Sequence, residues 1–151
     1  MEVFESTSEL PSNTKDLMNK AQEARETAYA PYSHFKVGVA IRLASGEVVI
    51  GNNQENAAYP SGLCAERVAV FYVGAAYPDE IIQEIAITAR SLNQLLDKPI
   101  GPCGACRQSL LEYEQKQNTP IAVFFKGETG KIIKVDAISD LLPFGFDGAY
   151  L

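Results

Sequence analysis

The chain is organised around Cys64-Ala65-Glu66-Arg67 and Pro102-Cys103-Gly104-Ala105-Cys106-Arg107, which together contain all three cysteines of its 151 residues. Three thiolates are a natural ligand set for one zinc ion, and three protein ligands leave the fourth tetrahedral position open to water, as in catalytic rather than structural sites. A carboxylate beside zinc-bound water is a general base, and Glu66 lies two residues after the first cysteine. The two stretches predict one hydrolytic zinc site with Glu66 as proton carrier and three ligands: Cys64, Cys103 and Cys106.

Such a site needs positive charge nearby, because one dication and three thiolates sum to a net charge of minus one. Arg67 and Arg107 each directly follow a ligand-bearing segment. Two helix N-termini directed at the cysteines would add about half a unit of positive charge each. We therefore expect Arg67 and Arg107 to compensate the charge, and Gln108 to support the site by hydrogen bonding.

Composition limits the kind of protein. Apolar residues make up 46% of the chain and charged residues 21%, which is ordinary for one globular domain, here residues 1–151. The net charge of −6 disfavours a nucleic-acid partner, since such a protein must neutralise many phosphates. No window approaches the ~20 apolar residues of a membrane span, so we expect no membrane partner and a cytoplasmic location.

Apolar periodicity and turn signals predict an α/β fold in which helices cover a sheet of about five strands. Residues 1–12 are expected to be an irregular lead-in. The expected helices cover residues 13–28, 64–76 and 103–116, and the expected strands cover residues 35–41, 47–50, 81–88, 121–125 and 131–135.

A polar loop, residues 51–57, follows the second expected strand. A cluster this polar is usually only a loop, but loops at strand ends also carry binding residues. Asn53 and Glu55 are separated by one residue, so their side chains can project to one side and bind a neutral sugar. Phe35, where the first strand begins, is a core aromatic by its pattern alone.

The chain from about Tyr29 to the C-terminus resembles the zinc-dependent nucleoside and nucleobase deaminases. The resemblance is carried by C-A-E at Cys64, by P-C-x-x-C at Pro102 and by the spacing of 39 positions between Cys64 and Cys103. Residues 30–38 (A-P-Y-S-H-F-K-V-G), residues 51–57 (G-x-N-x-E-N-A) and the L-L-P-x-x-F ending make the match most similar to cytidine deaminases of the short, homotetrameric type.

This resemblance implies a three-layer sandwich with a mixed five-stranded sheet, one Zn²⁺ per chain and a pyrimidine nucleoside substrate. It implies hydrolytic deamination of cytidine and 2'-deoxycytidine in pyrimidine salvage, in a homotetramer whose sites are shared between subunits. The implied substrate-binding residues are Phe35 against the pyrimidine ring, Asn53 and Glu55 on the ribose, and Ala57, Ala65 and Phe146. Phe146 would reach a neighbouring subunit, with Phe144 as the alternative.

Three other functions are considered. A thiol redox protein could use Cys103 and Cys106 as a C-x-x-C pair, but that leaves Cys64, Glu66 and the polar loop unexplained. A structural zinc module lacks a convincing fourth ligand. Within the deaminases, an antibiotic-directed enzyme or a nucleic-acid editor remains an alternative, although the acidic balance disfavours polyanions.

Overall fold

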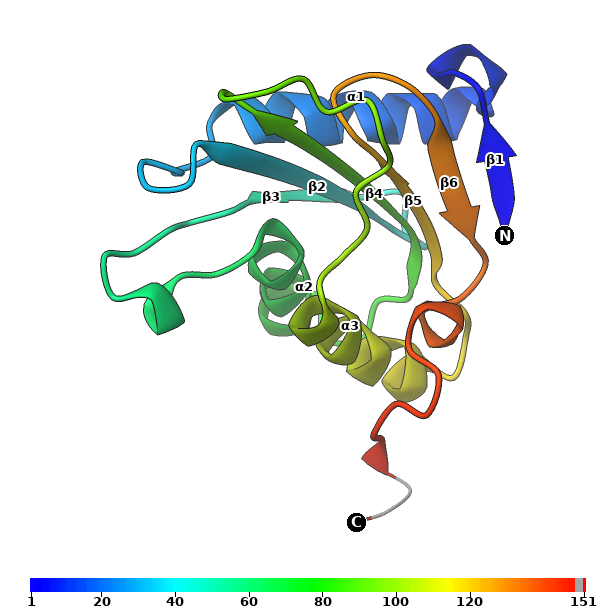
Figure 1. The fold of residues 1–151 in the computed structure, drawn as a ribbon. Coiled ribbons are helices and arrows are strands. Elements are labelled where there is room, and N and C mark those ends of the chain that lie inside the picture. The colour runs from blue at the N-terminus through cyan, green and yellow to red at the C-terminus, as the bar shows by residue number, and fades with distance from the viewer. Residues whose placement is uncertain (149–150) are drawn as a thin grey trace.

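The computed structural model describes residues 1–148 and residue 151, and it is a three-layer α/β sandwich (Figure 1). Helix α1 covers one face of the sheet, whereas α2 and α3 lie side by side on the opposite face. The helices are α1, Ser12–Glu26; α2, Ala65–Ala76; and α3, Gly104–Gln117. The predicted helices and the layered arrangement are confirmed.

The sheet is mixed, as expected, but it contains six strands. The strands are β1, Glu2–Phe4; β2, Phe35–Leu43; β3, Val48–Asn52; β4, Ile82–Ser91; β5, Ala122–Lys126; and β6, Ile132–Val135. Their order is β1-β6-β5-β4-β2-β3, and β4 and β5 form the parallel pair while the other neighbouring pairs are antiparallel. Because β4 and β5 run parallel, α3 serves as the crossover between them.

The sixth strand corrects the expectation that residues 1–12 form an irregular lead-in. Glu2–Phe4 pairs antiparallel with β6, and a short 3-10 helix, Thr7–Glu9, follows it. Two side-chain contacts hold this edge: Lys134 Nζ donates to Glu2 Oε1 at 3.0 Å, and the rings of Phe4 and Phe124 lie 6.4 Å apart. A strand of three residues is too short to show a periodicity of two, so it gave no signal in the sequence.

Two apolar clusters, one on each face of the sheet, hold the layers together. The α1 face buries Leu17, Met18 and Ala21 against sheet residues such as Phe124. The opposite face buries the apolar side of α2 and part of α3. At Gly51 a Cβ would lie 2.9 Å from Ala69 Cβ and from the Ala65 carbonyl oxygen, so the glycine lets the first turn of α2 press against β3.

A buried carboxylate fixes the C-terminal segment to α3. Glu114 Oε2 accepts hydrogen bonds from the backbone N–H groups of Ile121 at 2.9 Å and Ile138 at 2.7 Å. Its Oε1 accepts from Ser139 N at 3.0 Å. The chain around the 3-10 helix Ile138–Leu141 is therefore anchored to the helix that also carries two of the cysteines. None of the helices within residues 1–148 has both the length and the apolarity to cross a bilayer.

Candidate active site

The three cysteines meet where two helices begin. Cys64 is the N-cap of α2, Cys103 is the N-cap of α3, and Cys106 lies in the first turn of α3. Their Sγ atoms all lie within 4.8 Å of one another, and the Cys103 and Cys106 sulfurs are 3.4 Å apart. Both helix N-termini thus direct partial positive charge toward the cluster, as expected from the positions of the cysteines in the sequence.

This donor set fits a zinc ion. Three soft sulfur ligands select zinc among the common divalent ions, and the absence of a fourth cysteine leaves one coordination position for a small molecule. Among the described residues, Glu66 and Arg67 are the other titratable groups that interact with the cysteine sulfurs. The residues therefore form a catalytic kind of zinc site rather than a closed structural one.

The electrostatics of the thiols already favour a thiolate. The hydrogen bond from Cys106, with the guanidinium of Arg67, lowers the pKa of Cys64 to about 5. The same thiolate and burial raise the pKa of Cys106. Cys64 therefore loses its proton more readily than Cys106, and binding of a dication by thiolates must release protons.

Glu66 is buried beside the cluster, with 5% of its surface exposed. Burial raises the pKa of its carboxyl above the ordinary value, and the charge of Cys64 adds to that effect. A raised pKa makes the carboxylate a stronger base than an exposed glutamate, which favours its role as a proton carrier. Its position in the first turn of α2 matches the one expected from the sequence.

The two arginines expected to compensate the charge, Arg67 and Arg107, have different hydrogen-bond partners. Arg67 Nη2 donates to Cys64 Sγ at 3.7 Å, and Arg67 Nε is buried without a hydrogen-bond partner. Arg107 instead donates to two backbone carbonyls, through Nε to Pro102 at 2.8 Å and through Nη1 to Leu141 at 2.9 Å. Arg67 is thus placed beside the sulfurs, whereas the hydrogen bonds of Arg107 join the start of α3 to the C-terminal segment.

Gln108 also faces the C-terminal segment rather than the sulfurs. Its Nε2 donates to the carbonyl oxygen of Phe146 at 2.8 Å. Phe146 itself is 56% exposed, and Phe144 is fully exposed with a positive φ of 59°. The C-terminal segment extends away from the body of the molecule (Figure 1), so neither aromatic ring packs into the core.

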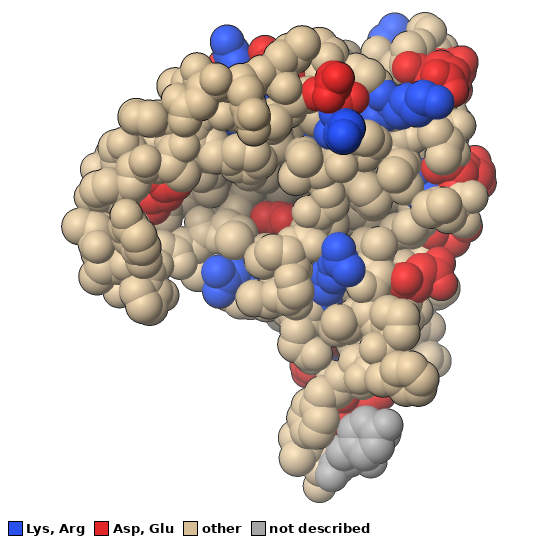
Figure 2. All heavy atoms as spheres, viewed as in Figure 1, with Lys and Arg blue, Asp and Glu red and all other residues tan. Residues whose placement is uncertain are grey.

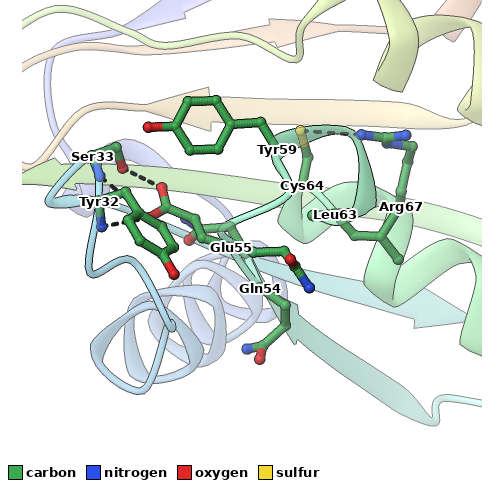
Figure 3. A pocket seen from close by; sticks show the side chains of 11 residues that line it. Tyr32, Ser33, Gln54, Glu55, Tyr59, Leu63, Cys64 and Arg67 are labelled. Atoms are coloured by element: carbon green, nitrogen blue, oxygen red, sulfur yellow. Dashed lines mark hydrogen bonds between the residues drawn. The ribbon is translucent and has the colours of Figure 1, made fainter.

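A hollow of about 410 Å³ adjoins the cluster, and Cys64 and Arg67 form one end of it (Figure 3). In the space-filling view the same face is recessed beside the loop that carries the 3-10 helix Tyr59–Ser61, with acidic atoms inside the recess (Figure 2). The lining residues are Tyr32, Ser33, Asn53, Gln54, Glu55, Asn56, Tyr59, Gly62, Leu63, Cys64 and Arg67. The volume is in the range of small-molecule sites.

Glu55 lies toward the other end of the hollow (Figure 3), Asn53 also lines it, and both are hydrogen-bonded to the segment before and within β2. Glu55 Oε2 accepts from the backbone N–H groups of Tyr32 at 3.0 Å and Ser33 at 3.2 Å. These bonds and the hydroxyl of Ser33 outweigh the effect of burial and lower the pKa of Glu55. Buried Asn53 accepts from Val37 N at 2.8 Å and donates to the Phe35 carbonyl at 2.9 Å.

The remaining predicted residues surround these two. Phe35 is half-buried at the first position of β2, and Ala65 is fully buried at the first position of α2. Ala57 lies exposed in the loop after β3, and His34, expected at the surface, is exposed. Phe35, Ala57 and Ala65 are not among the residues that line the hollow.

Ser33 is the residue that the sequence reasoning missed. Its hydroxyl contacts both Glu55 and Phe35 N, and it lies on the wall of the hollow (Figure 3). A signal was available: a serine two residues before a strand begins often accepts a hydrogen bond from the backbone N–H two positions later. Only the fold reveals that Glu55 lies opposite this serine.

Comparison with known proteins agrees with this geometry. A family model described as the cytidine and deoxycytidylate deaminase zinc-binding region matches residues 11–121. The cytidine deaminase of Halalkalibacterium halodurans is 36% identical over 130 residues, which cover 86% of this chain and 91% of that protein; that of Sporosarcina psychrophila is 34% identical over 136 residues, which cover 89% and 91%. The crystal structure of cytidine deaminase from Burkholderia pseudomallei superposes with a TM-score of 0.76 at 38% identity, covering 91% of this chain and 100% of that one.

The matched zinc-binding region and the three-cysteine group in the structure both indicate one Zn²⁺ per chain. The match covers α1, both cysteine segments and the Asn53–Glu55 loop, so it includes the elements that build the hollow. The chain belongs to the cytidine and deoxycytidylate deaminase family.

Proposed function

We propose that this protein catalyses the hydrolytic deamination of cytidine and 2'-deoxycytidine to uridine and 2'-deoxyuridine, with release of ammonia. The observation that carries the proposal is the buried carboxyl of Glu66 beside three convergent thiols, one of which, that of Cys64, belongs to a residue lining a hollow of about 410 Å³. The cytidine deaminases that this chain resembles support the choice of substrate.

Zinc bound by Cys64, Cys103 and Cys106 would acidify a water molecule toward a pKa of about 7 and so supply the nucleophile for C4 of the pyrimidine. Glu66 takes the proton of that water on its carboxylate and delivers it to ring N3. The same carboxylate then accepts the proton of the hydroxyl group added at C4 and passes it to the amino group, so that the C4–N bond breaks, ammonia leaves and the C4 carbonyl forms. Arg67, 3.7 Å from Cys64 Sγ, offsets part of the negative charge of three thiolates.

The nucleoside subsite follows from the residues at the far end of the hollow. Phe35 packs against the pyrimidine ring, and Asn53 and Glu55 receive the ribose hydroxyls. Ala57, through its backbone, and Ala65 complete the substrate-binding residues. The position of Glu55 on the wall of the hollow supports this role. Asn53 also lines the hollow, and its side-chain oxygen and nitrogen are each hydrogen-bonded to the backbone of β2.

The assembly we propose is a homotetramer in the cytoplasm, formed from single-domain chains, with each active site completed by the C-terminal segment of a neighbour. The exposure of the Phe144 and Phe146 rings supports this assembly, since exposed apolar side chains on a terminal segment are typical of an interface between subunits. We assign the contact to Phe146, with Phe144 as the alternative. A sizing measurement tests the assembly, and a fully active monomer would exclude shared sites.

The first experiment follows the absorbance of cytidine over time with purified protein and quantifies zinc in the same sample. Loss of the cytidine band with about one zinc per chain is the expected result. Zinc without turnover of cytidine or deoxycytidine would contradict the proposed substrate. A protein without zinc that forms a reducible disulfide between Cys103 and Cys106 would contradict the deaminase mechanism and favour thiol chemistry.

A further inference from the structure

We infer that Ser33 is a positioning residue that couples the carboxylate of Glu55 to the backbone of Phe35. The residue proposed to bind the sugar, Glu55, and the residue proposed to contact the base, Phe35, are thus positioned by the same hydroxyl group. The inference rests on the proposed function for the roles of Glu55 and Phe35. The hydrogen bonds themselves are features of the structure and do not depend on those roles.

The hydroxyl of Ser33 makes two hydrogen bonds whose directions are fixed by chemistry. An ionised carboxylate can only accept, so the hydroxyl proton is donated to Glu55 Oε1. The oxygen of the same hydroxyl then presents its lone pairs to the backbone N–H of Phe35, which donates to it at 3.0 Å. Figure 3 shows Ser33 turned toward Glu55 at one end of the hollow, opposite Cys64 and Arg67.

The residue between Ser33 and Phe35 in the sequence, His34, has an unusual backbone conformation. His34 has a φ of 56°, in the left-handed region that side-chain-bearing residues seldom adopt. Its backbone is tied on both sides, because His34 N donates to the Ala30 carbonyl at 3.1 Å and Leu92 N donates to the His34 carbonyl at 2.9 Å. Ser33 therefore bridges a sharp turn, and its hydroxyl sets the angle at which Phe35 enters β2.

The carbonyl side of Phe35 is held independently by Asn53, whose Nδ2 donates to it at 2.9 Å. Asn53 Oδ1 also accepts from Val37 N at 2.8 Å. Together, Asn53 and the Ser33–Glu55 pair hold the N–H and the carbonyl of Phe35. The backbone from which its ring projects is thus held before any ligand arrives, which lowers the entropic cost of binding.

The same bonds limit what Glu55 can recognise. A carboxylate has about four acceptor positions. Three are used, by the Ser33 hydroxyl and by the backbone N–H groups of Tyr32 and Ser33. One position is left for the ligand, so Glu55 is arranged to accept a single sugar hydroxyl rather than both hydroxyls of a diol.

The test is the pair Ser33→Ala and Ser33→Thr, assayed with cytidine. Ser33→Ala removes both hydrogen bonds, and we expect KM to rise about tenfold, the factor typical for loss of one hydrogen bond to a charged group. We expect kcat to stay within about twofold, since no bond to the thiols or to Glu66 changes. Ser33→Thr keeps the hydroxyl and should restore most of the loss.

Ser45→Ala is the matched control. Ser45 Oγ also accepts from the backbone N–H two residues later, Glu47 N at 3.4 Å, but it lies in the turn between β2 and β3 and does not line the hollow. Its removal should leave KM and kcat unchanged. If Ser45→Ala raised KM as much as Ser33→Ala, the effect would be a general loss of a turn hydrogen bond and the inference would be wrong.

Hydrogen exchange of the Phe35 amide supplies a readout without substrate. We expect it to be slow in the parent protein and in Ser45→Ala, faster in Ser33→Ala, and slow again in Ser33→Thr. An unchanged KM in Ser33→Ala, an equal loss in kcat, or an unchanged Phe35 exchange rate would each overturn the coupling. A parent protein that fails to deaminate cytidine would instead overturn the proposed function, and the exchange comparison would still decide whether Ser33 holds Phe35.

Discussion

The two ends of the hollow are built on different physical grounds. At the cysteine end the polar atoms face one another: three sulfurs within 4.8 Å, one guanidinium at 3.7 Å and the carboxyl of Glu66. At the Glu55 end, the carboxylate and the amide of Asn53 bond to backbone groups of the chain itself. The first end is completed by a metal ion, whereas at the second the chain itself fills all but one of the acceptor positions of Glu55.

This difference separates reaction from orientation. Groups that carry a proton or hold an ion must be available to change partner, so they cannot all be satisfied by the protein. Groups that orient a substrate work better when their geometry is fixed in advance. The predictions below ask whether the two ends are as independent as their hydrogen bonds indicate.

Removal of zinc by a chelator should have the largest effect. We expect complete loss of cytidine turnover and a lower melting temperature, because an ion bound only by the folded state stabilises it. The amides of Phe35 and Val37 should stay protected from hydrogen exchange, since their partners lie at the Glu55 end. Loss of that protection together with the metal, restored on adding zinc back, would show that the two ends form one unit.

Glu66→Gln should lower kcat by about 10²- to 10⁴-fold, the contribution typical of a general acid–base group. The amide has nearly the shape of the carboxyl but cannot carry the proton, so bound zinc and melting temperature should be close to those of the parent. Metal analysis, steady-state kinetics and thermal unfolding measure the three quantities. Glu112→Gln, which changes an exposed carboxylate on α3, is the control. Near-parental turnover in Glu66→Gln would exclude the mechanism.

Asn53→Ala should affect both binding and stability. It leaves the part-buried N–H of Val37 and carbonyl of Phe35 without their partner, at a cost of up to about 1–3 kcal/mol for each unpaired group. We expect kcat/KM to fall by about 10- to 100-fold, mainly through KM, with a melting temperature lower by several degrees.

Asn93→Ala, at an exposed position, should change neither quantity. A raised KM in Asn53→Ala with an unchanged melting temperature would show instead that Asn53 acts only through direct contact with the ribose.

Lys126→Met should have the smallest effect and should leave turnover unchanged. Lys126 is 6% exposed, and among the described residues no carboxylate pairs with its ammonium group. Burial, and then the charge of Arg25, lower its pKa. The unfolded chain therefore binds this proton more tightly than the folded protein, which costs stability below the folded-state pKa and no longer does so above the ordinary lysine pKa of about 10.4.

The methionine variant should accordingly melt a few degrees higher at pH 7, and its advantage should shrink as the pH approaches about 10.4. Thermal unfolding at several pH values measures this. A loss of turnover in Lys126→Met would contradict the view that an isolated buried charge outside the hollow is only a matter of stability.

Local sequence determined most of the elements and the reacting end of the site. The starts of α2 and α3 depend on residues close in the sequence. Cys103 and Cys106 lie on the same side of the start of α3 because they are three positions apart. The position of Glu66 in the first turn after Cys64 is equally local. These features depend on neighbours along the chain, so a pattern in one segment is enough to predict them.

Contacts between distant segments needed the tertiary structure. The N-terminal strand exists because Glu2–Phe4 pairs with β6 near the other end of the chain, and Arg107 and Gln108 turn to the C-terminal segment that Glu114 anchors. The bond between Ser33 and Glu55 joins residues 22 positions apart. Sequence alone identified the residue types that the chemistry requires, whereas the fold decided their hydrogen-bond partners, because a partner's position in space depends on the packing of the whole chain.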